Sequence, residues 1–320
     1  MVKRAALIVL VLLAFSSVTA HADVARLDHV DRPGQRQQTL SVYSAAMDRV
    51  IPLRVITPAD TSAPRPTLYL LNGAGGGEDV ANWYNQTDIV SFFADKNVNV
   101  VTPAAGAFSY YTDWQRDDPT LGRNKWQTFL TEELPPIIDA TLRTTGVNAI
   151  AGLSMSATAV LNLAIAAPDR YRAVGAYSGC AAVADPVGRA AVDLVMARAG
   201  ADAANMWGAP DDPAWRAHDV ILNAERLRGT AIYLSSATGL PGPIETAAAA
   251  PTPAYLDQIL LGGSIEAVAH LCTQRLAARL TELAIPAQVE FRPTGTHTWK
   301  YWEQDLHTSW PLFAEALGTS

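Results

Sequence analysis

The most informative part of the chain is AIAGLSMSATAVLNLAIAA, residues 149–167. Its apolar start predicts a buried strand, and its Ala-rich remainder predicts a helix that ends before Pro168. At the junction, GLSMS (residues 152–156) resembles the G-x-S-x-G turn between a strand and a helix, with Ser156 in place of the second glycine. Such a turn exposes its central serine, so Ser154 is the candidate nucleophile. A serine that only caps the helix is the alternative.

Short β-rich runs alternate with helical patterns on both sides of this stretch. We expect strands at residues 40–43, 53–56, 67–71, 98–101, 149–153, 173–177, 231–234 and 287–291. The first two strands read as an antiparallel pair joined near Asp48, and a helix over residues 125–142 is expected to break at Pro135-Pro136. The alternation predicts a mostly parallel sheet of about eight strands with helices on both faces, which is typical of an α/β-hydrolase.

The start of the chain predicts export. Lys3 and Arg4 precede a short apolar run, and AHA (residues 20–22) offers small residues at the positions that a signal peptidase reads. We expect a secretory signal peptide over residues 1–22 and one catalytic domain over residues 23–320, secreted or held in the cell envelope. The apolar run is too short for a membrane anchor, and no later stretch is long and apolar enough to span a bilayer.

The composition of the chain limits the classes of partner and cofactor that we expect. The 320-residue chain has a formal net charge of −7, which gives no reason to expect nucleic acid as a partner. It shows neither metal-ligand spacing nor a cofactor fingerprint, so we expect no metal and no cofactor. Export permits a disulfide between the two cysteines, Cys180 and Cys272. Two buried free thiols are the alternative, because the sequence alone does not show that the cysteines meet.

A glycine-rich loop, NGAGGG (residues 72–77), follows the strand expected at residues 67–71. In an α/β-hydrolase this loop supplies one N–H of the oxyanion hole, and the residue after the nucleophile supplies the other. We therefore expect Ala74 and Met155 to be the two donors. The loop lacks the GK[ST] ending of a phosphate-binding loop, and a plain flexible loop is the other alternative.

The catalytic histidine of this fold lies on a loop after the last strand. His297 follows the strand expected at residues 287–291, whereas His307 lies in a helical pattern. We therefore favour His297 as the base that takes the Ser154 proton and later returns it to the leaving group.

The acid that orients this histidine is harder to place. It usually follows the strand expected at residues 231–234, yet residues 235–240 contain no carboxylate. The later candidates are Glu245, Asp257 and Glu266, and chemistry alone does not separate them.

Five separated parts of the chain carry a family resemblance. They are FSYYTDW (108–114), KWQTFLTEELP (125–135), GLSMS (152–156), MWG (206–208) with DPAW (212–215), and GTHTWKYW (295–302). In this order they resemble the antigen 85-type mycolyltransferases of mycolic-acid-containing actinobacteria, over roughly residues 35–310. The resemblance implies an enzyme that moves a mycolyl chain from one trehalose ester to another, to arabinogalactan or, in some corynebacterial members, to proteins.

The resemblance also assigns residue roles. It implies that Ser154 is the nucleophile, that His297 is the catalytic histidine and that Glu266 is the catalytic glutamate. It supports Ala74 and Met155 as oxyanion donors. The implied partners are a glycolipid donor and a sugar or cell-wall acceptor. A secreted carboxylesterase or lipase with the same triad, and a non-catalytic surface-binding protein, are the alternatives.

Other features of the resemblance concern the acceptor and the cysteines. Antigen 85 members bind trehalose through an Asp and an Arg where this chain has Asn72 and Gly75, so charge-assisted hydrogen bonds to the sugar are lost. Trp299 still offers an aromatic face on which a sugar could stack. Cys180 and Cys272 look like the cysteine pair of corynebacterial-type members, which favours a disulfide.

The acyl chain needs an apolar groove. Residues 181–206 are rich in Ala and Val and are a candidate lining. Ordinary helix packing explains the same composition equally well.

Overall fold

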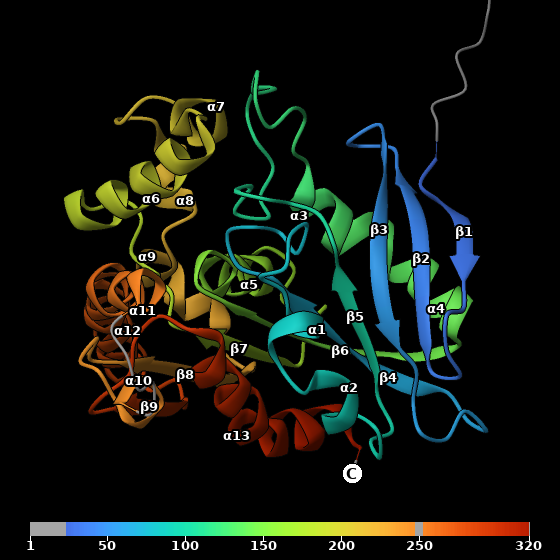
Figure 1. The fold of residues 1–320 in the computed structure, drawn as a ribbon. Coiled ribbons are helices and arrows are strands. Elements are labelled where there is room, and N and C mark those ends of the chain that lie inside the picture. The colour runs from blue at the N-terminus through green and yellow to red at the C-terminus, as the bar shows by residue number, and fades with distance from the viewer. Residues whose placement is uncertain (1–23, 247–251, 320) are drawn as a thin grey trace, which may run out of the picture.

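The computed structural model describes residues 24–246 and 252–319, so the signal peptide expected over residues 1–22 lies outside the described residues. Within them, one nine-stranded sheet has the order β1-β2-β3-β5-β4-β6-β7-β8-β9 (Figure 1). The strands are β1 (Arg26–Asp31), β2 (Gln37–Ser44), β3 (Arg49–Ile56), β4 (Arg65–Leu71), β5 (Asn99–Pro103), β6 (Thr144–Leu153), β7 (Ala173–Tyr177), β8 (Ala231–Ala237) and β9 (Gln288–Arg292).

The sheet confirms the expected α/β-hydrolase architecture. Strands from β5 through β4, β6, β7 and β8 to β9 are parallel, and β2 pairs with β3 in antiparallel register around a turn in which Asp48 is left-handed. Strand β1, which lies before the first expected strand, raises the count above the expected eight. Most residues of β1 are exposed, so it lacks the apolar alternation by which strands are found in a sequence.

Helices cover both faces of the sheet. They are α1 (Trp83–Gln86), α2 (Ile89–Phe92), α3 (Trp126–Thr128), η1 (Phe129–Glu133), α4 (Leu134–Leu142), α5 (Met155–Ala166), α6 (Pro186–Ala199), α7 (Ala203–Trp207), α8 (Pro213–Ala217), α9 (Val220–Asn223), η2 (Ala224–Leu227), α10 (Pro243–Thr246), α11 (Pro253–Asp257), η3 (Gln258–Gly262), α12 (Gly263–Glu282) and α13 (Trp299–Leu317). One apolar core packs α4, α5 and α12 on the sheet, and a second packs α1, α2 and α13. Among residues 24–246 and 252–319, no helix has the length and hydropathy that a membrane crossing needs.

The expected break at Pro135-Pro136 is wrong. Helices α3, η1 and α4 follow one another without interruption, and both prolines lie in the first turn of α4. A proline is tolerated in a first turn, where its missing N–H would have little to bond. The π-turn η1 precedes it, with the Leu134 N–H bonded to the Phe129 carbonyl. The chain therefore continues as a helix through this segment.

Candidate active site

Ser154 lies in a tight turn between β6 and α5. Its backbone has φ 56° and ψ −122°, a conformation that costs energy for a residue with a side chain and is typical of a nucleophile turn. A Cβ on Gly152 would lie 2.5 Å from the Ser156 hydroxyl, and a Cβ on Gly179 would lie 3.0 Å from the Ser154 carbonyl. The turn therefore depends on small neighbours, and it exposes the Ser154 hydroxyl at the carboxyl end of the sheet.

Three side chains from distant parts of the sequence meet at this turn. The Nε2 atom of His297 lies 2.8 Å from Ser154 Oγ, and its Nδ1 atom lies 2.8 Å from Glu266 Oε2. Both are hydrogen-bond distances. With Nδ1–H donating to the carboxylate, Nε2 is free to accept the serine proton. The arrangement can generate a serine alkoxide for attack on an ester.

Glu266 is fully buried on α12 and its carboxylate is held by groups besides His297. Ser178 donates its hydroxyl to Oε1 at 2.8 Å, and the Ala237 N–H donates to the same oxygen at 2.7 Å. Sequence reasoning does not reveal either donor, although both residues lie at carboxyl ends of parallel strands, Ser178 just after β7 and Ala237 as the last residue of β8. The end of β8 thus contributes an N–H to the Glu266 carboxylate, whereas residues 235–240 contain no carboxylate of their own.

The glycine-rich loop passes directly beside the serine. A Cβ on Gly73 would lie 2.8 Å from a terminal side-chain carbon of Leu153, so the loop backbone approaches the serine turn closely. The Gly73 carbonyl accepts a 3.0 Å hydrogen bond from the Gly76 N–H. Because C=O and N–H point in opposite directions across a trans peptide, this bond turns the Ala74 N–H away from the loop. A 2.7 Å bond from the Phe108 N–H to the Ala74 carbonyl holds the next peptide.

The Met155 N–H is oriented in the same way. The Ser154 carbonyl, which belongs to the same peptide group, accepts a 3.1 Å hydrogen bond from the Ala157 N–H. Met155 is also the first residue of α5, where backbone N–H groups have no acceptor within the helix and carry the positive end of its dipole. Ala74 and Met155 thus come from the two segments that flank the serine.

Asn72 and Gly75, the two loop residues considered for binding a sugar acceptor, differ in burial and surroundings. Asn72 is buried, with its Nδ2 donating to the Pro103 carbonyl at 3.0 Å and its Oδ1 accepting from the Trp83 N–H at 3.2 Å. Its amide therefore braces the loop and is not directed at a ligand. Gly75 is only partly buried, and a Cβ there would lie 3.1 Å from a carboxylate oxygen of Asp79.

Aromatic rings continue from the histidine towards Trp299. The His297 ring lies edge-on to Trp302 at 4.8 Å between centroids, and Trp302 lies edge-on to Trp299 at 5.3 Å. Trp299 also contacts Trp83 at 5.4 Å and is only partly buried. An aromatic surface thus lies close to His297, where a sugar could stack on it.

Cys180 and Cys272 form a disulfide. Cys180 lies two residues after Ser178, and Cys272 lies on α12 with Glu266. The Thr273 hydroxyl adds a 3.4 Å hydrogen bond to the Gly179 carbonyl. The bridge therefore ties the helix that carries Glu266 to the loop that carries Ser178, one of the hydrogen-bond donors to Glu266.

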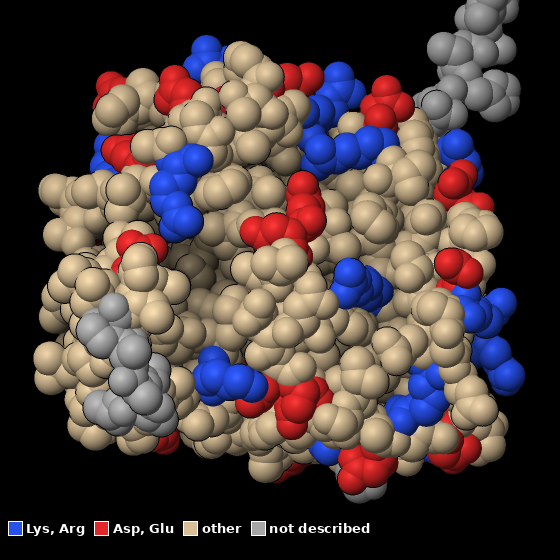
Figure 2. Space-filling model, viewed as in Figure 1, with Lys and Arg blue, Asp and Glu red and all other residues tan. Residues whose placement is uncertain are grey.

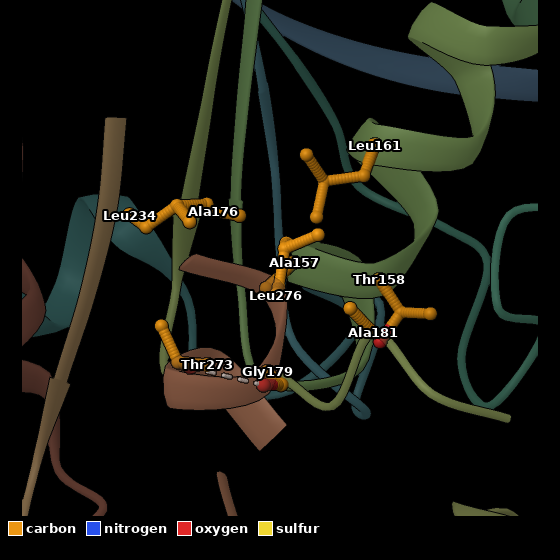
Figure 3. Close-up of a pocket in the computed structure, with 9 residues that line it drawn as sticks. All are labelled: Ala157, Thr158, Leu161, Ala176, Gly179, Ala181, Leu234, Thr273 and Leu276. Atoms are coloured by element: carbon orange, nitrogen blue, oxygen red, sulfur yellow. Dashed lines mark hydrogen bonds between the residues drawn. The ribbon is translucent and has the colours of Figure 1, made fainter. Parts of the chain in front are cut away.

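A small cavity lies behind the serine turn, between α5, β7, β8 and α12 (Figure 3). It is lined by Ala157, Thr158, Leu161, Ala176, Gly179, Ala181, Leu234, Thr273 and Leu276. Its volume of about 10 Å³ holds one water molecule at most, so it is not an acyl-chain site. Val192, Met196 and Met206, in the segment expected to line a groove, are buried in the core, as ordinary helix packing requires.

The molecular surface is hollowed in the view of Figure 2. Compared with Figure 1, the hollow lies between helix α11 at the left and helix α1 near the centre. Most of the surface that surrounds it is neither acidic nor basic.

Comparison with known proteins places this site in context. Residues 44–313 match the Esterase family, described as "Putative esterase". The diacylglycerol acyltransferase/mycolyltransferase Ag85A of Mycobacterium tuberculosis is 30% identical over 309 residues, which cover 90% of this chain and 84% of that protein. The Ag85B protein of Mycobacterium leprae is 30% identical over 301 residues, covering 89% and 86% of the two chains.

Solved structures are similar over nearly the whole chain. The crystal structure of Mycobacterium tuberculosis MPT51 superposes with a TM-score of 0.75 at 27% identity, covering 89% of this chain and all of that one. An S-formylglutathione hydrolase from Agrobacterium tumefaciens superposes with a TM-score of 0.62 at 16% identity, covering 91% and 99%. At that identity the second similarity concerns the fold alone.

Proposed function

Because the chain belongs to the Esterase family and to the antigen 85-type mycolyltransferases, it is an acyltransferase or esterase, and we propose that Ser154, Glu266 and His297 form its catalytic triad. The observation that carries this proposal is the position of His297, which lies 2.8 Å from both the Ser154 hydroxyl and the Glu266 carboxylate. Nucleophile, base and orienting acid are thereby in the order that acyl transfer needs.

The first half-reaction forms an acyl-enzyme. Ser154 Oγ attacks the ester carbonyl of the donor while His297 Nε2 takes its proton, and Glu266 stabilises the imidazolium that results. The Ala74 and Met155 N–H groups bind the oxyanion of the tetrahedral intermediate. The C–O bond to the sugar then breaks, the alcohol leaves with the proton from His297, and the acyl group stays on Ser154.

The second half-reaction passes the acyl group to an acceptor hydroxyl. The oxygen of the acceptor hydroxyl attacks the acyl-enzyme while His297 removes the proton of that hydroxyl. His297 then returns the proton to Ser154 as the new ester leaves. Transfer exceeds hydrolysis only when the acceptor is held in better position than water. Trp299, beside the histidine, offers a stacking surface for a sugar, whereas Asn72 is turned inward and Gly75 has no side chain.

We propose trehalose monomycolate as the donor and trehalose, arabinogalactan or another hydroxyl of the cell envelope as the acceptor. The similar Ag85A and Ag85B proteins are named diacylglycerol acyltransferase/mycolyltransferase, which supports a lipid donor. We also propose that residues 1–22 direct export and are removed, and that residues 23–320 form a single catalytic domain that acts in the cell envelope.

Product analysis tests the function. The mature protein is incubated with trehalose monomycolate, with and without added trehalose, and mass spectrometry follows the acyl group. Formation of the trehalose diester by the native protein but not by Ser154→Ala supports transfer to trehalose. Free acid alone, still dependent on Ser154, identifies an esterase towards this donor. Equal turnover by the two proteins contradicts the proposed triad.

A further inference from the structure

Three leucines with exposed side chains lie together near the catalytic histidine. Leu256 on α11 is 46% exposed, and Leu260 and Leu261 on η3 are 67% and 46% exposed. We call these three residues the leucine ridge. Soluble proteins rarely expose several large apolar side chains together, and where they do, the surface usually binds something.

The ridge belongs to an ordered segment. The Thr252 side chain caps α11 by accepting a 3.2 Å hydrogen bond from the Tyr255 N–H. Tyr255 and Ile259 are partly buried, so the helix is packed on one side while the leucines stay in solvent. The leucines are therefore held outward by a folded helix.

Hydrogen bonds join this segment to the catalytic histidine. Gly262, next to Leu261, accepts a 3.2 Å hydrogen bond from the His297 N–H. Gln258, between Leu256 and Leu260, donates to the Glu245 carboxylate at 3.3 Å. Helix α12, with Glu266, begins directly after η3. In the view of Figure 1, α11 borders the hollow of Figure 2. The ridge thus belongs to the rim of the site.

The lack of basic residues around the ridge favours an apolar binding partner. Asp257 is the only charged residue between Thr252 and Ser264, and no Lys or Arg occurs from there until Arg275. The whole chain carries a net charge of −7. Anionic headgroups are bound by clusters of Lys and Arg, which this segment lacks. Side chains of leucine instead gain free energy by entering a hydrocarbon phase.

We propose that the leucine ridge inserts into the hydrocarbon surface of the lipid layer that contains the acyl donor. The proposal rests on the proposed function, because a donor with a long acyl chain resides in such a layer and its ester must reach Ser154 from there. Docking next to His297 brings the mouth of the site against the lipid surface, so that the ester travels only a short path through water.

Vesicle flotation tests the docking without catalysis. The mature protein carrying Ser154→Ala, which leaves lipid esters intact, is mixed with neutral phosphatidylcholine vesicles and floated on a density gradient. The ridge variant adds Leu256→Ser, Leu260→Ser and Leu261→Ser. The control adds Leu271→Ser instead. Leu271 is an exposed leucine outside the ridge: it lies on α12 and is 59% exposed.

We expect the ridge variant to bind vesicles about tenfold more weakly than its parent, and the control to bind within about twofold of it. The proposal is overturned if the ridge variant binds vesicles as well as its parent, or if the control loses as much vesicle binding as the ridge variant. It is also overturned if the parent does not bind vesicles. A dimer that becomes monomeric in the ridge variant without a change in vesicle binding overturns it too, because the ridge is then an interface between copies. If the triple variant does not fold, Leu260→Ser alone replaces it.

Activity measured with Ser154 intact separates this proposal from the proposed function. The three ridge substitutions are made in the native protein, without Ser154→Ala. On dissolved p-nitrophenyl butyrate this active ridge variant is expected to stay within about twofold of the native protein, and on trehalose monomycolate in vesicles to be about tenfold slower. Equal loss on both substrates overturns the docking proposal. Absence of turnover of either substrate by the native protein contradicts the proposed function and leaves the flotation result standing.

Discussion

Thr296, the residue before His297, donates a 2.6 Å hydrogen bond from its hydroxyl to the buried carboxylate of Glu245. The same carboxylate accepts from the Tyr301 hydroxyl at 2.7 Å and from the Gly242 N–H at 2.7 Å. Burial by itself raises the pKa of Glu245, but these hydrogen bonds outweigh it and hold the pKa below its ordinary value. Glu245 therefore anchors the loop that carries the histidine.

Glu245→Gln is expected to lower kcat by about tenfold with little change in KM. An amide NH₂ in place of one carboxylate oxygen would face hydroxyl and N–H donors, so the loop would lose bonds and His297 would be held less precisely. Steady-state kinetics on a soluble ester measure the split between kcat and KM. Tyr301→Phe is the matched control, because it removes one donor and keeps the carboxylate, and it should have a smaller effect. An unchanged kcat in Glu245→Gln would remove this role.

Glu266→Gln is expected to lower kcat by about a thousandfold, because an amide neither stabilises the imidazolium nor reliably selects the tautomer with Nδ1–H. Asp257→Asn, at the end of the exposed helix α11, should leave kcat within about twofold. Both variants are compared by steady-state kinetics after their folding is checked by circular dichroism. A large loss in Asp257→Asn with none in Glu266→Gln would place the acid elsewhere.

Reduction of the Cys180–Cys272 disulfide is expected to destabilise the protein. The bridge closes a sequence separation of 92 residues. The chain-entropy model assigns such a loop about 4 to 5 kcal/mol. Thermal unfolding with and without reductant should therefore show a lower Tm in the reduced protein. A thiol count on unreduced, denatured protein should find no free thiol at these two positions, and two free thiols per chain would be incompatible with the bridge.

Stability should respond to pH through Asp305. Burial raises the pKa of Asp305 to about 6 despite its ion pair with Arg292. Between about pH 4 and pH 6 the folded protein then holds a proton that the unfolded chain releases, so this residue's contribution to stability falls as pH rises. The free energy of unfolding of the native protein relative to Asp305→Asn should fall by roughly 2 kcal/mol over this window. A constant difference in urea unfolding experiments would contradict the shift, and Asp257→Asn controls for net charge.

Local patterns in the sequence predict much of the fold and part of the site. The apolar run before Ser154 and the Ala-rich run after it define the turn, and the position of His297 after the last strand identifies the base candidate. Strand β1 is not predicted from the sequence because its side chains are mostly exposed and so lack an apolar alternation. The helix over residues 125–142 is predicted, but its continuity through Pro135 is not, because a π-turn places both prolines in the first turn of α4.

The acid shows where sequence reasoning stops. Glu245 and Glu266 are both almost fully buried, and both are held by several donors. Only the three-dimensional packing of α12 against the end of β8 brings one of them to the histidine. The resemblance to a known family points to Glu266 where residue chemistry leaves three candidates, whereas Ser178 has no sequence signal beyond its position after a strand.

Asn72 illustrates the same limit for binding residues. Its place in a glycine-rich loop suggests an exposed side chain, but the loop folds so that a side chain at Gly77 would collide with the Asn72 amide. Asn72 consequently packs inward against Pro103 and Trp83. The direction of a loop side chain depends on such close backbone approaches, which composition does not reveal.

The most direct test of the account is the intact mass of the protein during turnover. The native protein and Ser154→Ala are mixed with trehalose monomycolate without acceptor, quenched in acid and analysed by mass spectrometry, followed by peptide mapping. We predict that the native protein gains the mass of one mycolyl group on the peptide containing Ser154, and that Ser154→Ala gains none. A mycolyl group on another residue, or one that persists in Ser154→Ala, would contradict the central claim that Ser154 carries the acyl chain.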